Sequence, residues 1–172
     1  MKKGTLILTA VIAMAVIFSS CKEKEKTKTE LLTIKKGWVL SAATSSPAYA
    51  LSDGSFATDL MKDGYLYECE LDEVIKFTDN GAQTIVPNTL CEEFGYQTET
   101  AALWTFEDDE TILKMQLPMF YNAAGTSFDE EFEKCQILAL TEKELRLKYT
   151  FTDTENPTKG EYSFTLTYVP AK

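Results

Sequence analysis

The sequence predicts an all-β domain, an antiparallel up-and-down barrel of about eight strands with one short helix. Three observations predict it: strand-length segments in which apolar and polar residues alternate, turn residues between these segments, and short connections that favour sequential hairpins. Sequential antiparallel strands of this number close naturally into a barrel, which removes the exposed edges of an open sheet. A β-sandwich uses the same patterns and is the alternative.

The clearest strands lie in the last third of the chain. Residues 145–152 alternate apolar with polar side chains, and residues 162–168 repeat the pattern. Residues 153–160 between them are rich in Asp, Asn, Pro and Gly, which favour turns. The two segments therefore predict a hairpin with one buried face.

Earlier segments repeat this plan. Residues 104–117 indicate two strands joined by a polar turn at 107–110, and Ile75 and Phe77 precede Asp79-Asn80-Gly81, a sequence suited to a tight hairpin. Residues 136–140 lead into the strand at Leu145. Because Ile137, Leu138 and Leu140 cannot all face inward in a regular strand, we expect a bulge there.

The remaining elements are less regular. We expect the first strand at residues 37–43 and a short helix around residues 65–74. Residues 44–64 and 118–131 predict long loops, each with several aromatic residues, that would cover a barrel mouth or form a contact surface.

The N-terminus has the order of a signal peptide. Lys2 and Lys3 precede an apolar or small run over residues 5–18, followed by Ser19, Ser20 and Cys21. The run is shorter than the roughly 20 apolar residues that a membrane-spanning helix needs. We therefore expect residues 1–20 to be removed.

Residues 18–21 resemble the lipobox of bacterial lipoproteins, although Phe18 stands where that motif usually has Leu. The resemblance implies cleavage before Cys21 and acylation of its thiol, and several acyl chains would anchor the protein stably. Secretion with ordinary cleavage near Ser20 is the alternative. Lys22 follows the cysteine where an Asp favours inner-membrane retention, so we expect the outer membrane of a cell envelope.

Three segments follow from this interpretation. Residues 1–20 are the signal peptide, and residues 21–32 are the lipidated cysteine and a tether, most of it alternating Lys and Glu or Thr. Residues 33–172 are one β domain, since about 140 residues are near the commonest size for a domain with its own core.

The charge of the chain excludes one class of partner. The 17 basic and 27 acidic residues give a formal net charge of −10, and loss of two lysines with residues 1–20 would make it −12. Binding to nucleic acid needs a basic face, and the lysines do not cluster beyond the tether. We therefore expect no nucleic-acid partner.

The order of these features resembles the lipocalin-like domain lipoproteins of Gram-negative bacteria. The resemblance rests on the lipobox, Gly37-Trp38 at the first strand, the block from Cys69 through Asp79-Asn80-Gly81 to Cys91, Trp104, and the hairpin around residues 140–147. Lipocalins place one residue between this Gly and Trp, whereas here the two are adjacent. The resemblance implies a calycin-type barrel and a small hydrophobic ligand, without naming its contacts.

The resemblance also bears on the cysteines. With Cys21 acylated, an oxidising envelope favours a disulfide between two of the other three. The resembling family pairs cysteines at the spacing of Cys69 and Cys91, which flank the hairpin at residues 75–86. Such a bridge would add roughly 3 kcal/mol by restricting the unfolded chain. Cys135 lies in a strand pattern typical of a buried small apolar residue.

No motif predicts catalysis, a cofactor or a metal site. The chain has no histidine, which removes Ser-His-Asp and Cys-His machinery and imidazole metal ligands. The acidic pairs Asp108-Asp109 and Asp129-Glu130 lie in turn-like segments, where solvated acids are common. A carboxylate-dependent hydrolase is therefore the third and most distant hypothesis.

We expect a non-enzymatic, membrane-anchored protein that binds a small apolar or amphipathic ligand in its barrel. Its candidate ligand contacts are the aromatic residues of the predicted strands, although core packing is the favoured explanation for each one taken singly: Trp38, Trp104, Tyr149, Phe151, Tyr162, Phe164 and Tyr168. The alternative is a structural or interaction lipoprotein with a filled core, such as an inhibitor or an accessory subunit that contacts an envelope protein.

Overall fold

The chain folds as an antiparallel β-structure with very little helix. The computed structural model describes residues 25–89, 100–115, 132–153 and 160–172. The described elements, in chain order, are α1 (Lys28–Leu32), β1 (Trp38–Ala50), β2 (Phe56–Asp59), the 3₁₀ turn η1 (Glu68–Glu70), β3 (Val74–Phe77), β4 (Ala82–Val86), β5 (Thr100–Leu103), β6 (Thr105–Glu107), β7 (Ile112–Met115), β8 (Glu133–Leu140), β9 (Leu145–Asp153) and β10 (Gly160–Pro170).

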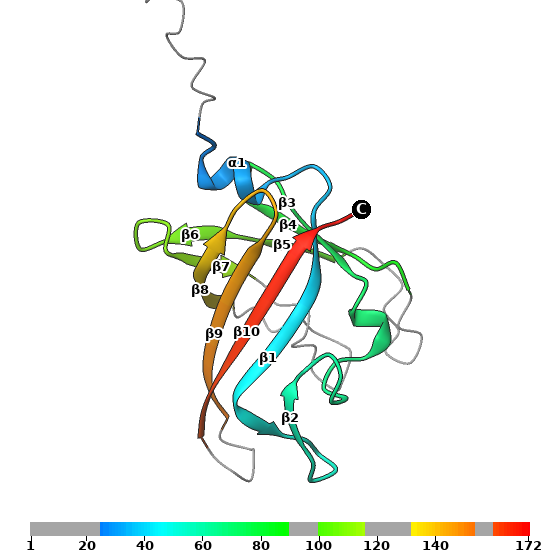
Figure 1. Cartoon of the computed structure of the whole chain (residues 1–172). Coiled ribbons are helices and arrows are strands. Elements are labelled where there is room, and N and C mark those ends of the chain that lie inside the picture. Colours follow the sequence, from blue (N-terminus) through cyan, green and yellow to red (C-terminus); the bar gives the residue numbers. More distant parts are fainter. Residues whose placement is uncertain (1–24, 90–99, 116–131, 154–159) are drawn as a thin grey trace, which may run out of the picture.

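The strands form one sheet that nearly closes on itself (Figure 1). Their order is β5-β4-β3-β1-β10-β9-β8-β7-β6, with β2 paired to β1 off this path. The two ends of the path, β5 and β6, are separated in the chain by Trp104 alone. Residues 100–107 therefore pair with β4 through their first half and with β7 through their second half.

This arrangement confirms the predicted antiparallel, up-and-down barrel. When β5 and β6 are counted as one interrupted strand, the path contains eight strands among the described residues. Each is antiparallel to its neighbours. A sandwich would leave two sheets with free edges. Here the first and last strands of the path belong to one stretch of chain.

The alternation in the sequence decides which residues face the interior. In β10 the side chains of Tyr162, Phe164, Leu166 and Tyr168 are buried, and their neighbours are more exposed. The register places Leu166 opposite Leu147, which is also fully buried. Opposite residues of an antiparallel pair share a face, so these side chains pack together in the core.

Helix α1 covers one end of the barrel, called here the α1 end. Thr27 and Glu30 form a capping box that starts the helix, and Leu32 at its last position is fully buried. Lys28 Nζ donates to the carbonyl oxygen of Glu110 in the β6–β7 turn at 2.6 Å. The α1 residues therefore belong to the packed structure, although the sequence places them in the tether.

Two further elements differ from the expectation. The segment 44–64 was expected to be a loop, but β1 continues to Ala50 and β2 forms at 56–59. The reason is that this part of β1 pairs with both β10 and β2. The helix expected at 65–74 is only the turn η1, since the chain enters β3 at Val74. The expected bulge in β8 is confirmed by the register shift between Ile137 and Ala139.

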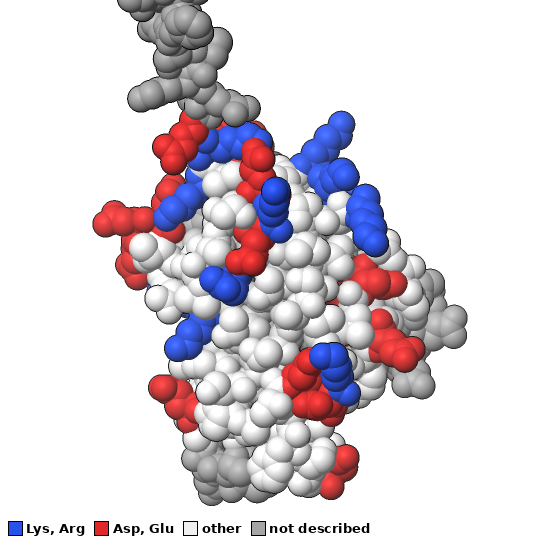
Figure 2. Space-filling model, viewed as in Figure 1, with Lys and Arg blue, Asp and Glu red and all other residues white. Residues whose placement is uncertain are grey.

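Charge is unevenly distributed over the surface. Figure 2 shows most of the visible basic side chains in the half of the molecule that carries α1. Residues 51–73, which include β2 and η1, contain seven acidic residues and a single basic residue, Lys62. Lys62 is itself paired with Asp59, at 2.5 Å.

Several expectations lie outside the described residues: the signal peptide, the acylation of Cys21, the pairing partner Cys91, the acidic pair Asp129-Glu130 and the loop at 118–131. Among the residues that are described, no helix is both long and apolar enough to cross a membrane.

Candidate functional site

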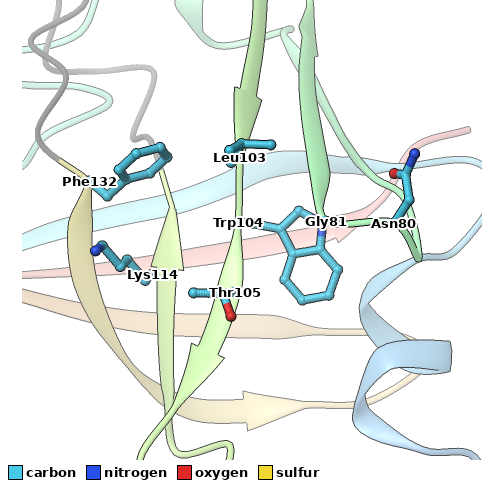
Figure 3. Close-up of a pocket in the computed structure, with 7 residues that line it drawn as sticks. All are labelled: Asn80, Gly81, Leu103, Trp104, Thr105, Lys114 and Phe132. Atoms are coloured by element: carbon cyan, nitrogen blue, oxygen red, sulfur yellow. The ribbon is translucent and has the colours of Figure 1, made fainter.

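A pocket opens where the barrel strand changes partner between β5 and β6 (Figure 3). It has a volume of about 330 Å³ and is called here the seam pocket. Its walls come from the β3–β4 turn, the β5–β6 strand, β7 and the start of β8: Asn80, Gly81, Leu103, Trp104, Thr105, Lys114 and Phe132. A volume of this size is at the lower end of the range for small-molecule sites.

The pocket exists because the β4–β5 ladder ends at a turn. Its last paired residues are Ala82 and Leu103, and Gly81 next to Ala82 adopts a φ of +84° in the tight turn that the sequence predicts. The backbone N–H of Trp104 donates to the Gly81 carbonyl at 2.8 Å, and from Thr105 onward the strand pairs with β7. The gap between the two ladders forms the pocket.

Trp104 is held firmly in the pocket wall. Its indole Nε1 donates to the carbonyl oxygen of Thr78 at 3.0 Å. Its ring makes edge contacts with Phe77 at 5.9 Å and with Phe106 at 5.3 Å between centroids. With both its polar atom and its ring edges engaged, Trp104 offers a rigid apolar surface to a ligand.

The pocket combines apolar walls with one cation. Leu103 is 62% exposed and lines the pocket. Lys114 Nζ lies 5.5 Å from the centroid of the Phe132 ring, a cation–π distance. The pocket can therefore take an apolar group against Leu103, Trp104 and Phe132, and a polar or anionic group beside Lys114.

Four of the predicted aromatic residues meet in the barrel interior. Tyr149, Phe151, Tyr162 and Phe164 come from β9 and β10, and with Tyr49 and Tyr65 they form the aromatic cluster. The Phe151 and Phe164 centroids are 4.9 Å apart, and Tyr149 stacks on Phe151 at 5.1 Å. Burial, and then a hydrogen bond with the Glu133 carboxylate, raise the pKa of Tyr149.

The other predicted aromatics lie apart from this cluster. Trp38 is fully buried at the α1 end, where its indole N–H donates to Leu32, and Tyr168 is buried beside β1 opposite Leu40. Trp104 borders the seam pocket. The structure thus does not bring the seven residues together at one place, and the role of each as a ligand contact stays a prediction.

The cysteines and the acidic pair Asp108-Asp109 that the structure describes were candidates for a reactive site. Cys69 is disulfide-bonded, and Cys135 is the free cysteine of the described chain. Burial raises the pKa of the Cys135 thiol to about 12, so it is protonated at neutral pH. Asp108 and Asp109 occupy a left-handed turn. No group of three or more Cys, Asp or Glu side chains among the described residues is arranged to hold a metal ion.

Most of the residues that line the seam pocket could not be identified as ligand contacts from the sequence. The sequence indicates only that Asn80 and Gly81 belong to a turn. It indicates only that Lys114 faces outward, between the apolar Leu113 and Met115. Trp104 is the one pocket residue that the sequence singles out. The exposure of Leu103 follows from strand register across the barrel, which leaves no local signal.

The fold and the seam pocket together define the chain as a small antiparallel barrel protein with a ligand-sized pocket in its wall. No family model and no curated protein matches its sequence. Among solved structures, it is similar to bovine odorant-binding protein in complex with undecanal, with 14% identity and a TM-score of 0.41, over 88% of this chain and 77% of that chain. The bovine protein with a selenium-containing odorant gives 12% identity and a TM-score of 0.40, over 90% and 78%. The likeness is too distant to bear on what this chain binds.

Proposed function

We propose that this protein is a non-enzymatic, lipid-anchored envelope protein that binds a small apolar or amphipathic ligand. The observation that carries the proposal is the seam pocket of about 330 Å³, walled by Leu103, Trp104 and Phe132. Small-molecule sites are concave, mostly apolar and provided with a few polar groups. The seam pocket has each of these properties.

The position of Lys114 narrows the ligand class. Its ammonium lies at the pocket beside Phe132. On the neighbouring strands Glu107 pairs with Lys134, and the Glu107 carboxylate also interacts electrostatically with Lys114. An anionic or strongly polar head group would therefore meet Lys114 while an alkyl chain lies against Trp104 and Leu103. A medium-chain carboxylate is the simplest ligand of this kind.

The proposed anchor at Cys21 would hold the α1 end towards the membrane. The described chain begins at Glu25, three residues before α1, and four residues span at most about 14 Å. Figure 2 shows most of the visible basic side chains in this half of the molecule, interspersed with acidic ones, and the basic ones would face anionic headgroups. The acidic segment 51–73 would then face away from the lipid, in the periplasm or at the cell surface.

Ligand binding is tested with octanoate and octanol on the full chain carrying Cys21→Ser, by calorimetry and by tryptophan emission. We expect octanoate to bind and to change the emission of Trp104, and the change to disappear in Trp104→Phe. Leu103→Asp places a charge in the pocket at an exposed position and should weaken octanoate binding at least tenfold. Leu138→Asp, at an exposed site on β8 away from the pocket, is the matched control.

Two outcomes would decide against the proposal. Failure of both octanoate and octanol to bind would favour a protein that acts through its surface on another envelope protein. Equal losses in Leu103→Asp and Leu138→Asp would show that the effect is not specific to the seam pocket.

The anchor has a separate test. Cys21→Ser should abolish acylation, detected by mass spectrometry of the N-terminal peptide, and should release the protein from the membrane fraction. Unchanged retention in that fraction would count against the lipid anchor and leave the ligand-binding proposal intact.

A further inference from the structure

The turn that leads into β3 contains four acidic residues. The carboxylates of three of them are either exposed to solvent or hydrogen-bonded. Glu68 is exposed, and Glu70 Oε2 accepts a hydrogen bond from the backbone N–H of Tyr67 at 2.7 Å. The Asp72 carboxylate accepts from the backbone N–H of Thr89 at 3.1 Å and from its hydroxyl at 2.5 Å. These bonds fix the turn and join it to the end of β4.

Glu73 is the fourth acidic residue and is different. It is only 8% exposed, and its Oε2 atom is buried without a hydrogen-bond partner in the part of the chain that the structure describes. Burying a polar atom without a partner usually costs about 1–3 kcal/mol, so such atoms are rare in folded proteins. An orphaned buried carboxylate oxygen therefore calls for a functional explanation.

Glu73 lies at the core of the barrel rather than on its outer face. It precedes β3, whose buried residues Ile75 and Phe77 follow at strand spacing. It also interacts electrostatically with the phenol of Tyr168, a side chain only 3% exposed. The carboxyl group therefore stands between the acidic turn and the interior.

The charges that act on Glu73 are all negative. Burial, then the carboxylates of Glu70 and Asp72, raise its pKa to about 8. Seven acidic residues lie in the segment 51–73, and its single lysine, Lys62, is paired with Asp59. The two charged groups that perturb Glu73 are thus both carboxylates, those of Glu70 and Asp72, and neither is a cation.

We propose that Glu73 is the acceptor of a second binding site, which takes the ammonium group of a small organic amine. An ammonium supplies both the N–H donor and the positive charge that the Glu73 carboxylate lacks. A carboxylate or phosphate ligand would be repelled by Glu70, Asp72 and Glu73 together. This site goes beyond the seam pocket, whose cation Lys114 selects the opposite charge.

The test compares three water-soluble probes that differ only in their polar group. 2-Phenylethylamine, 2-phenylethanol and 3-phenylpropionate are titrated calorimetrically at pH 8 into the full chain carrying Cys21→Ser. We expect the amine to bind at least tenfold more tightly than the alcohol and the acid. Glu73→Gln should weaken amine binding at least tenfold, whereas Glu68→Gln, which removes an exposed charge from the same turn, should change it less than twofold.

The outcomes separate this site from the seam pocket. Leu103→Asp should leave amine binding unchanged while it weakens octanoate binding, so the two sites can succeed or fail independently. Amine binding that survives Glu73→Gln, or that falls equally in Glu68→Gln, would overturn the proposal, since it would reflect general attraction to an acidic surface. Far-UV circular dichroism establishes that each variant is folded.

Discussion

The indole Nε1 of Trp38 donates a 2.8 Å hydrogen bond to the carbonyl oxygen of Leu32, and both side chains are fully buried. The bond joins the first residue of β1 to the last residue of α1. Carbonyl oxygens at a helix C-terminus have no partner within the helix. Trp38 therefore satisfies one of them and fixes the helix over the end of the barrel.

Trp38→Phe should lower the free energy of unfolding by about 2 kcal/mol, because it removes this hydrogen bond and leaves a small void. Urea unfolding followed by circular dichroism measures the change. Trp104→Phe removes a hydrogen bond to Thr78 at a less buried position and should cost less. Equal costs for the two variants would contradict a special role for Trp38 at the α1 end.

Gly37→Ala should be strongly destabilising, by roughly 3 kcal/mol or more. Gly37 has a φ of +77°, and a Cβ there would lie 2.7 Å from Val74 Cγ1 and 2.8 Å from the Ile75 carbonyl oxygen. Gly54→Ala is the matched control, with a φ of +86° but no atom within 4 Å of a Cβ. It should lose only about 1 kcal/mol from backbone strain, as measured by denaturant unfolding of both variants.

Glu73→Gln should stabilise the protein, increasingly so as the pH rises. The pKa of Glu73 is raised to about 8 in the folded protein from an ordinary value of 4.5. Below pH 4.5 the carboxyl is protonated in both states. Between pH 4.5 and 8 it ionises in the unfolded state first, so the wild type loses stability over this range. The gain in Glu73→Gln should approach about 2–4 kcal/mol at pH 8.

The measurement is urea unfolding of wild type and Glu73→Gln at pH 4, 6 and 8, with Glu68→Gln as the exposed control. A stability difference that does not depend on pH would show that Glu73 titrates normally. If Glu73→Gln both stabilises the protein and loses amine binding, the buried Glu73 carboxylate destabilises the fold but is needed to bind the amine.

Thiol counting tests the predicted disulfide between Cys69 and Cys91. The full chain with Cys21→Ser, unfolded without reductant, should expose one reactive thiol, that of Cys135, and three after reduction. In the folded protein Cys135 should react very slowly with alkylating reagents, because it is fully buried with a pKa of about 12. Three thiols before reduction would disprove the bridge.

Where pairing is local, the strands were predictable. β9 and β10 are joined by a short connection, and their alternating residues reach the same face of the sheet, so the pattern alone identifies them. The Asp79-Asn80-Gly81 turn is predictable for the same reason, since the positive φ at Gly81 is a local requirement. The bulge in β8 follows from three apolar residues that cannot all face inward.

The seam pocket and Glu73 were not predictable as sites. Leu103 is brought to the pocket by its pairing with Ala82, the last pair of the β4–β5 ladder, and Lys114 by its pairing with Thr105 in the β6–β7 ladder. In the sequence Glu73 is one more acidic residue of a turn, whereas in the fold it is only 8% exposed and interacts electrostatically with Tyr168. Both features depend on residues far apart in the chain.

The sequence by itself determined the antiparallel strands and their hairpins, because apolar alternation and turn chemistry act between near neighbours; that these strands close into a barrel and not a β-sandwich was decided by the tertiary structure. It also predicts the lipid anchor at Cys21, which is a linear motif. Only the tertiary structure decided where the barrel seam opens and which carboxylate loses its hydrogen-bond partners. The physical reason is that cavities and burial arise where ladders end and distant strands meet, and the sequence carries no local signal for either.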